Sequence, residues 1–138
     1  MKPLAGALAA KIVAPVGFGE KLPKALQLAG DSAKKHRIEV TSDLARSGLP
    51  GQAISAEAWV AVDKTQKWGG IVGAIQDNGD YERGWLLGLT GSQFCFAVSS
   101  KSTSRLTYLK APRSFQTGFW YHVLGTYDGK NQCLYVDG

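Results

Sequence analysis

Hydrophobic and polar residues alternate along one long stretch in the middle of the chain, from Ala53 to Val62. The apolar set comprises Ile54, Ala56, Ala58, Val60 and Val62. The intervening set comprises Ser55, Glu57, Trp59 and Ala61. Because side chains of a β-strand point alternately to opposite faces, period-two alternation predicts a strand with one buried face. We expect this stretch to be a central strand of a sheet.

The C-terminal part of the chain carries the pattern of a β-hairpin. Two runs rich in β-branched and aromatic residues, Trp120–Tyr127 and Gln132–Val136, are separated by Asp128-Gly129 and two further residues. An Asp-Gly pair between two such runs is a strong signal for a tight turn. The first run is apolar on both of its faces, so we expect it to be covered on both sides.

Further short apolar runs are separated by turn residues. The strands expected from them are Ala25–Leu28, His36–Val40, Trp68–Gln76, Arg83–Leu89, Gln93–Val98 and Arg105–Leu109. Almost no stretch has the periodicity of a helix. Many short strands joined by turns predict an all-β antiparallel sandwich.

The first 24 residues do not fit this pattern, and we interpret them as a lead-in segment or a linker before a domain that spans residues 25–138. Pro3, Pro15 and Pro23 argue against a long helix here. The apolar run Leu4–Ala10 is short for a signal peptide, and no clear cleavage site follows it. No run approaches the ~18 apolar residues of a membrane-spanning helix, so no membrane span is expected.

The chain is basic, with a net charge of +5 and a calculated pI near 9.3. A basic chain raises the question of an anionic partner. The cations are spread along the sequence, and only Lys34–Arg37 forms a cluster. Since no nucleic-acid-binding motif accompanies them, no nucleic-acid partner is expected.

Two cysteines, Cys95 and Cys133, lie in the middle of expected strands. We favour two buried thiols. A disulfide remains the alternative, because it requires Cα atoms about 5.5 Å apart and sequence does not fix that distance. The sequence contains neither a Cys-x-x-Cys pair nor a Cys/His cluster, so it gives no indication of a metal or redox centre.

Two of these segments carry a family resemblance. Two runs of this chain resemble the late hairpin of LamG-like domains. The first, W-Y-H-V-x-G-T-Y-D-G, begins at Trp120, and the second, L-Y-V-D-G, ends at Gly138. The family's strand F-T-I-E-A-W-V is similar to Ile54–Val60. LamG-like domains belong to the concanavalin A-like lectin/glucanase jelly rolls, which include laminin G and pentraxin modules. The resemblance covers roughly residues 25–138. It implies an antiparallel jelly-roll β-sandwich that is incomplete here, with further strands in the natural polypeptide.

The resemblance also implies a function. We expect a non-catalytic recognition or accessory module of a larger secreted or envelope protein, with a carbohydrate or glycoprotein ligand and with other domains of the same polypeptide as partners. For this fold, a sulfated or acidic glycan would be a natural anionic ligand. The alternative is a structural or protein-interaction domain without a sugar site. Similar domains in bacterial multidomain proteins are fused to hydrolases such as phosphoesterases or sialidases.

Glucanase activity is not expected, and we predict that the chain is not an enzyme. The glucanases of this superfamily use carboxylates spaced E-x-D-x-x-E, and nothing here matches that spacing. Glu57 and Asp63 are six residues apart on their strand, ~20 Å at ~3.3 Å per residue, too far to act on one bond. His122 lies within an expected strand, and we interpret it as a packed, hydrogen-bonded structural histidine.

Exposed aromatic rings are the usual platform for sugars, by stacking. The candidate ligand contacts are Trp68, Tyr81, Trp85 and Tyr108. The alternative for each is a place in the core of the sandwich.

The candidate metal site is a calcium site formed by Asp77, Asn78, Asp80 and Glu82. Calcium takes six to eight oxygen ligands, and this loop could supply several of them. The alternative is an ordinary Asn-Gly turn with solvated acids. Related domains often use an aspartate in an early F-D-G motif, where this chain has Leu28-Ala29-Gly30. Ala29 has no side-chain oxygen, and Asp31 is the nearest substitute.

Overall fold

A computed structural model describes residues 10–13, 25–28, 37–43, 46–100 and 105–138 of the chain. It divides into two compact units, Met1–Gly48 and Leu49–Gly138. In the first unit, β1 (Ala10–Val13) pairs antiparallel with β2 (Ala25–Leu28). The predicted strand Ala25–Leu28 is therefore confirmed, and the division into a segment 1–24 and a domain 25–138 stays a prediction.

The predicted strand His36–Val40 is not found in its described part, residues 37–40. Ile38 is 37% exposed and Val40 is 85% exposed. The alternation of apolar and polar residues is real, but in the described part of the chain no strand pairs with this segment. Without a partner strand among the described residues, the apolar side chains of this segment stay exposed to different degrees.

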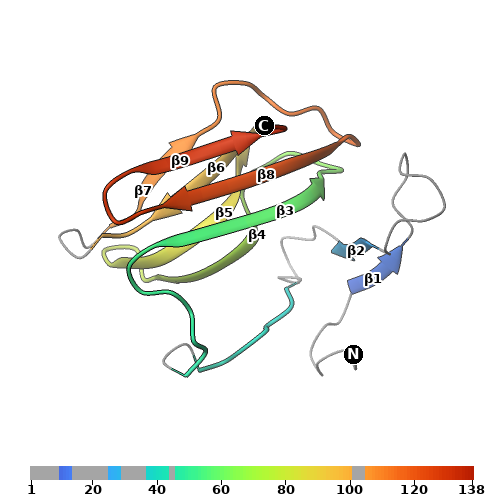
Figure 1. The fold of residues 1–138 in the computed structure, drawn as a ribbon. Coiled ribbons are helices and arrows are strands. Elements are labelled where there is room, and N and C mark those ends of the chain that lie inside the picture. Colours follow the sequence, from blue (N-terminus) through green and yellow to red (C-terminus); the bar gives the residue numbers. More distant parts are fainter. Residues whose placement is uncertain (1–9, 14–24, 29–36, 44–45, 101–104) are drawn as a thin grey trace. The chain divides into compact units, whose positions relative to one another are not determined.

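The second unit consists of two antiparallel sheets (Figure 1). One sheet contains, in spatial order, β4 (Gln66–Asp77), β5 (Glu82–Gly91), β6 (Gln93–Val98) and β7 (Thr107–Lys110). The other contains β3 (Ile54–Ala61), β8 (Trp120–Tyr127) and β9 (Gln132–Val136) in the order β3-β8-β9. The described residues include no helix, and thus none that is long and apolar enough to cross a membrane. The prediction of an all-β antiparallel sandwich is confirmed.

The expected hairpin and the expected alternating strand are both found, with one difference in position. β8 and β9 have the predicted bounds, and Gly129 in the turn between them adopts a φ angle of +96°. β3 has Ala56 buried and Trp59 59% exposed, as the alternation predicts. However, β3 lies at an edge of the described sheet, and β8 is its central strand. Hydrogen bonds to both β3 and β9 fix that place for β8.

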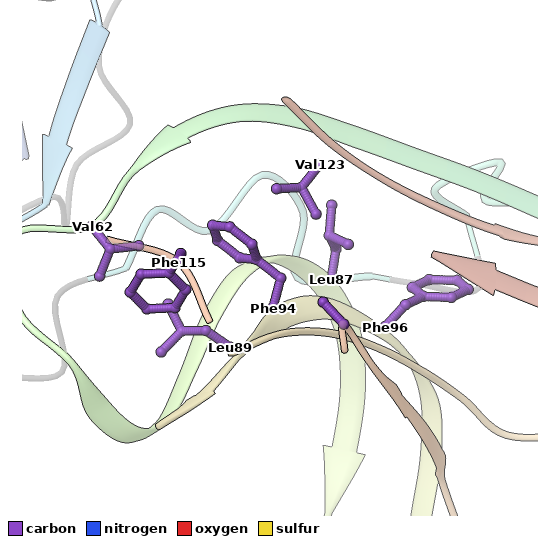
Figure 2. Close-up of a cluster of buried hydrophobic side chains, with 8 residues drawn as sticks. Val62, Leu87, Leu89, Phe94, Phe96, Phe115 and Val123 are labelled. Atoms are coloured by element: carbon purple, nitrogen blue, oxygen red, sulfur yellow. The ribbon is translucent and has the colours of Figure 1, made fainter. Parts of the chain in front are cut away.

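The core lies between the inner faces of the two sheets (Figure 2). Its buried members are Val62, Leu87, Leu89, Phe94, Phe96, Ala111, Phe115 and Val123. The Phe94 ring packs 4.8 Å from Phe115 and 5.4 Å from Tyr121, measured between centroids. Phe96 packs against β8 at Gly125, where an added Cβ would lie 2.4 Å from the Phe96 ring. Only glycine leaves room for this ring between the sheets.

The carboxylate of Asp128 closes the β8–β9 turn. It accepts hydrogen bonds from the backbone N–H groups of Lys130 and Asn131, at 2.8 and 2.6 Å, and from Asn131 Nδ2 at 3.0 Å. The hydrogen bonds from Asn131, and then that from Lys130, lower the pKa of Asp128 from 3.8 to about 2. The turn therefore holds this carboxylate in its ionised form.

We predict that Phe96→Ala lowers the free energy of unfolding by about 3–5 kcal/mol, because it leaves a cavity between two sheets that cannot close together. Phe119→Ala is the matched control, since Phe119 is 60% exposed. Its effect should stay within about 0.5 kcal/mol. Urea unfolding of both variants measures the difference, and equal effects would contradict the described core.

A second prediction concerns acid stability. Because the pKa of Asp128 is lower in the folded chain than its ordinary 3.8, its contribution is complete above pH 3.8 and is lost as the pH falls towards 2. Asp128→Asn should lower the melting temperature at neutral pH and flatten its decline between these pH values. The exposed Asp80 lies in another turn, so Asp80→Asn should retain the decline. Thermal melts across this pH range test both variants.

Candidate functional site

The sheet β4–β7 presents a pair of aromatic rings on its outer face. The ring centroids of Trp68 and Tyr108 are 5.3 Å apart, and Trp68 is 52% exposed. Trp68 lies on β4 and Tyr108 on β7, at opposite edges of this sheet. Because β5 and β6 lie between these strands, the two side chains must lean towards each other across the face of the sheet.

Register identifies the face on which this ring pair lies. Tyr108 pairs with Ala97, whereas the neighbouring Leu109 pairs with the core residue Phe96. Strand alternation therefore places Tyr108, Ala97 and Cys95 on the face opposite the core. Ala97 and Cys95 are nevertheless fully buried. Other side chains therefore cover Ala97 and Cys95 on this outer face. The Trp68–Tyr108 pair lies on the same face.

Two carboxylates stand near Tyr108. Burial raises the pKa of the Tyr108 hydroxyl, and the negative charges of Glu82 and Asp77 raise it further. Glu82 Oε2 accepts a hydrogen bond of 3.0 Å from the backbone N–H of Leu106, two residues before Tyr108. The Glu82 carboxylate is therefore fixed beside β7, at one end of the aromatic pair.

The other two predicted aromatic contacts lie elsewhere. Tyr81 is 39% exposed in the β4–β5 turn, with the guanidinium carbon of Arg83 5.5 Å from its ring centroid. Trp85 is half-buried and packs against the hydrophobic core. Trp85 pairs with Val98, two residues along each strand from the inward-facing pair Leu87 and Phe96, so Trp85 shares their inner face. The structure thus brings together Trp68 and Tyr108, and it gives Trp85 the core position that was the alternative.

The predicted calcium residues form a regular turn. Asp77 Oδ1 accepts a hydrogen bond of 2.9 Å from the N–H of Gly79, and the N–H of Asn78 donates to the Tyr81 carbonyl at 3.0 Å. Within the described ranges, no group of three or more His, Cys, Asp or Glu side chains comes together as metal ligands. This arrangement does not gather Asp77, Asp80 and Glu82 into a calcium shell. Ala29 and Asp31 lie outside the described residues, and calcium binding stays a prediction.

The outer face of the β3–β8–β9 sheet holds a cluster that the sequence reasoning missed. Trp59 is 59% exposed, and its ring centroid is 5.2 Å from that of His122. His122 Nε2 lies 3.1 Å from Glu57 Oε2, so the predicted structural role of this histidine has a hydrogen-bonding partner. Tyr135, on β9, is 45% exposed. A signal was present in the sequence, since Trp59 stands on the polar side of the alternating stretch, where a large ring faces solvent.

A pocket of about 380 Å³ lies at one end of the same sheet. Its lining includes Pro50, Ser55, Thr126 and the β8–β9 turn. Cys133 also lines it and is half-buried, whereas Cys95 is fully buried. Both thiols are free, and burial raises the pKa of Cys95. The preference for unpaired thiols holds, but only Cys95 is buried as expected.

Two antiparallel sheets packed face to face, with aromatic side chains exposed on both outer faces, define a β-sandwich domain. Residues 34–138 match the family described as the concanavalin A-like lectin/glucanases superfamily (Laminin_G_3), and the chain belongs to this family. The fold is therefore a concanavalin A-like jelly roll.

The chain is also similar to pappalysin-1 of Mus musculus, with 27% identity over 78% of the chain, and to pappalysin-1 of Homo sapiens, with 25% identity over the same share. These alignments cover 7% of each relative. The chain therefore spans a small part of the length of these curated relatives.

The calcium hypothesis predicts that millimolar calcium raises the melting temperature, because a ligand of the folded state stabilises it. The double variant Asp77→Ala/Asp80→Ala should abolish that shift. Glu57→Gln, which removes a carboxylate from the other sheet, should keep it. A parent chain that melts at the same temperature with calcium as with a chelator would contradict the hypothesis.

Proposed function

We propose that this chain is a non-catalytic recognition module that binds carbohydrate through the Trp68–Tyr108 ring pair, within a larger extracellular or cell-envelope protein. The observation that carries the proposal is the exposed Trp68 ring, which meets Tyr108 across the outer face of the β4–β7 sheet. Membership of a superfamily that includes lectins supports it.

The ring pair offers the two kinds of contact that a sugar requires. The C–H face of a sugar ring stacks on an aromatic ring, which is apolar and has a negative face. Sugar hydroxyl groups donate hydrogen bonds to acceptors such as ionised carboxylates. Glu82 supplies such a carboxylate near Tyr108 and is held in place by the Leu106 N–H. A fixed acceptor loses little entropy when a ligand binds.

The local charge favours a neutral sugar at this position. Glu82 and Asp77 raise the pKa of Tyr108, because their negative charges disfavour a second anion close by. The same field opposes a sulfate or carboxylate on a glycan. The net charge of +5 is spread over the whole chain, and salt screens its distant contributions over about 10 Å. Lys110 lies two residues after Tyr108 on the same face of β7, beside Cys95, whereas Glu82 and Asp77 are the side-chain carboxylates that act on Tyr108 itself. We therefore propose a neutral glycan instead of a sulfated or acidic one.

The test is isothermal titration of the 138-residue chain with neutral oligosaccharides, namely cello-, laminari-, chito- and galacto-oligosaccharides, and with heparin fragments as the anionic comparison. Trp68→Ala and Tyr108→Ala should each weaken binding of a neutral sugar by about two- to tenfold, the range expected for one aromatic contact. Tyr108→Phe keeps the ring and should bind nearly as well as the parent.

Trp59→Ala is the matched control, since Trp59 is as exposed as Trp68 but lies on the other sheet. It should leave sugar affinity unchanged. Equal losses in the Trp59 and Trp68 variants would contradict the assigned site. Heparin fragments that bind more tightly than every neutral sugar would contradict the charge argument.

A further inference from the structure

The outer face of the β3–β8–β9 sheet carries aromatic rings that the proposed sugar site does not use. Trp59 on β3 stands opposite His122 on β8, and Tyr135 on β9 stands opposite Leu124 on β8. Glu57 is the other strand partner of Leu124. The rings therefore extend across all three strands of the sheet, with Trp59 59% exposed and Tyr135 45% exposed.

The strands of this face carry an exposed carboxylate and no lysine or arginine side chain. The sequence has 16 Lys and Arg residues against 11 Asp and Glu, yet β3, β8 and β9 contain neither Lys nor Arg. The Glu57 side chain is 67% exposed beside His122. Asp137 Oδ1 accepts a hydrogen bond of 2.8 Å from the His122 backbone N–H. The β8–β9 turn carries one charge of each sign, Asp128 and Lys130, beyond the ends of the strands.

We propose that this face docks an extended segment of a partner protein that carries arginine or lysine side chains. A guanidinium or ammonium group is attracted to the face of a Trp or Tyr ring, and a nearby carboxylate completes the contact. The basic chain keeps its own cations off these strands, so the face is complementary to a cationic partner. Anionic glycans, nucleic acids and anionic lipid surfaces find no Lys or Arg on these strands and are repelled by the exposed Glu57 carboxylate.

The pocket of about 380 Å³ continues this face along the strands. Ser55 pairs with Thr126 and Thr126 with Cys133, one row beyond the row of Glu57, Leu124 and Tyr135. These three residues belong to the pocket lining. Since residues two apart on a strand share a face, this part of the lining lies on the same face as Tyr135 and Glu57, while Ile54 and Tyr127 line the pocket from the core side. The pocket can accept one side chain of the bound segment.

Fluorescence anisotropy of the full chain with a labelled peptide of alternating arginine and glycine tests the proposal, against a peptide of alternating glutamate and glycine. The arginine peptide should bind, and the glutamate peptide should not. Trp59→Ala and Glu57→Gln should each weaken binding by about two- to fivefold. Glu57→Gln keeps an oxygen that accepts the His122 hydrogen bond, so it removes the charge with little effect on packing. Rising salt should weaken binding further.

Trp68→Ala and Glu82→Gln are the matched controls on the other sheet, and both should leave peptide affinity unchanged. Peptide binding that these controls reduce as much as the Trp59 and Glu57 variants do would overturn the proposal. So would concentration-dependent self-association of the parent that Trp59→Ala abolishes, because a second copy would then occupy the face. The two proposals can be told apart. Trp59→Ala should weaken only peptide binding, and Trp68→Ala should weaken only sugar binding.

Discussion

The packing of Phe96 against the backbone of β8 at Gly125 is the contact on which the arrangement of the second unit depends. The ring is fully buried, and a Cβ at Gly125 would collide with it. Because this contact fixes the inner face of β8, alternation fixes the outer face as well. Val123 then points into the core, and His122 and Leu124 point outwards. The positions of Trp59, Glu57 and Tyr135 follow through their pairing with β8.

The two outer faces of the sandwich differ in their chemistry although they belong to one basic chain. The β4–β7 face brings together two rings from opposite edges of its sheet, with Glu82 held beside them. The β3–β8–β9 face spreads its rings over three adjacent strands and has no cation on them. Each face has a carboxylate near its rings, Glu82 near Tyr108 and Glu57 beside His122. The net charge of +5 therefore describes neither of them, since the field at a ligand is set by the nearest charges.

Several acidic residues that could serve as ligands for a metal or a substrate have a structural role in this chain. The carboxylates of Asp77, Asp128 and Asp137 accept backbone N–H groups at turns or strand ends, and that of Glu82 links β5 to the start of β7. Each of these hydrogen bonds satisfies a backbone N–H group that has no partner in the strand pairing. The turn aspartates resemble metal ligands in the sequence, because turns and metal loops draw on the same Asp, Asn and Gly.

The sequence by itself determined the elements whose pattern is local. Alternation located β3 and its exposed side, and Asp-Gly between two β-rich runs located β8 and β9. Alternation alone does not show that a partner strand exists, which is why the prediction of a strand at His36–Val40 was wrong for its described part, residues 37–40. Only the tertiary structure decided which rings meet. Trp68 reaches Tyr108, and His122 reaches both Trp59 and Glu57, across large separations in sequence. Trp85 turned inwards because its register with Val98 and the packing between the sheets placed it there. Strand order and sheet packing arise from many long-range contacts at once, and no local pattern encodes them.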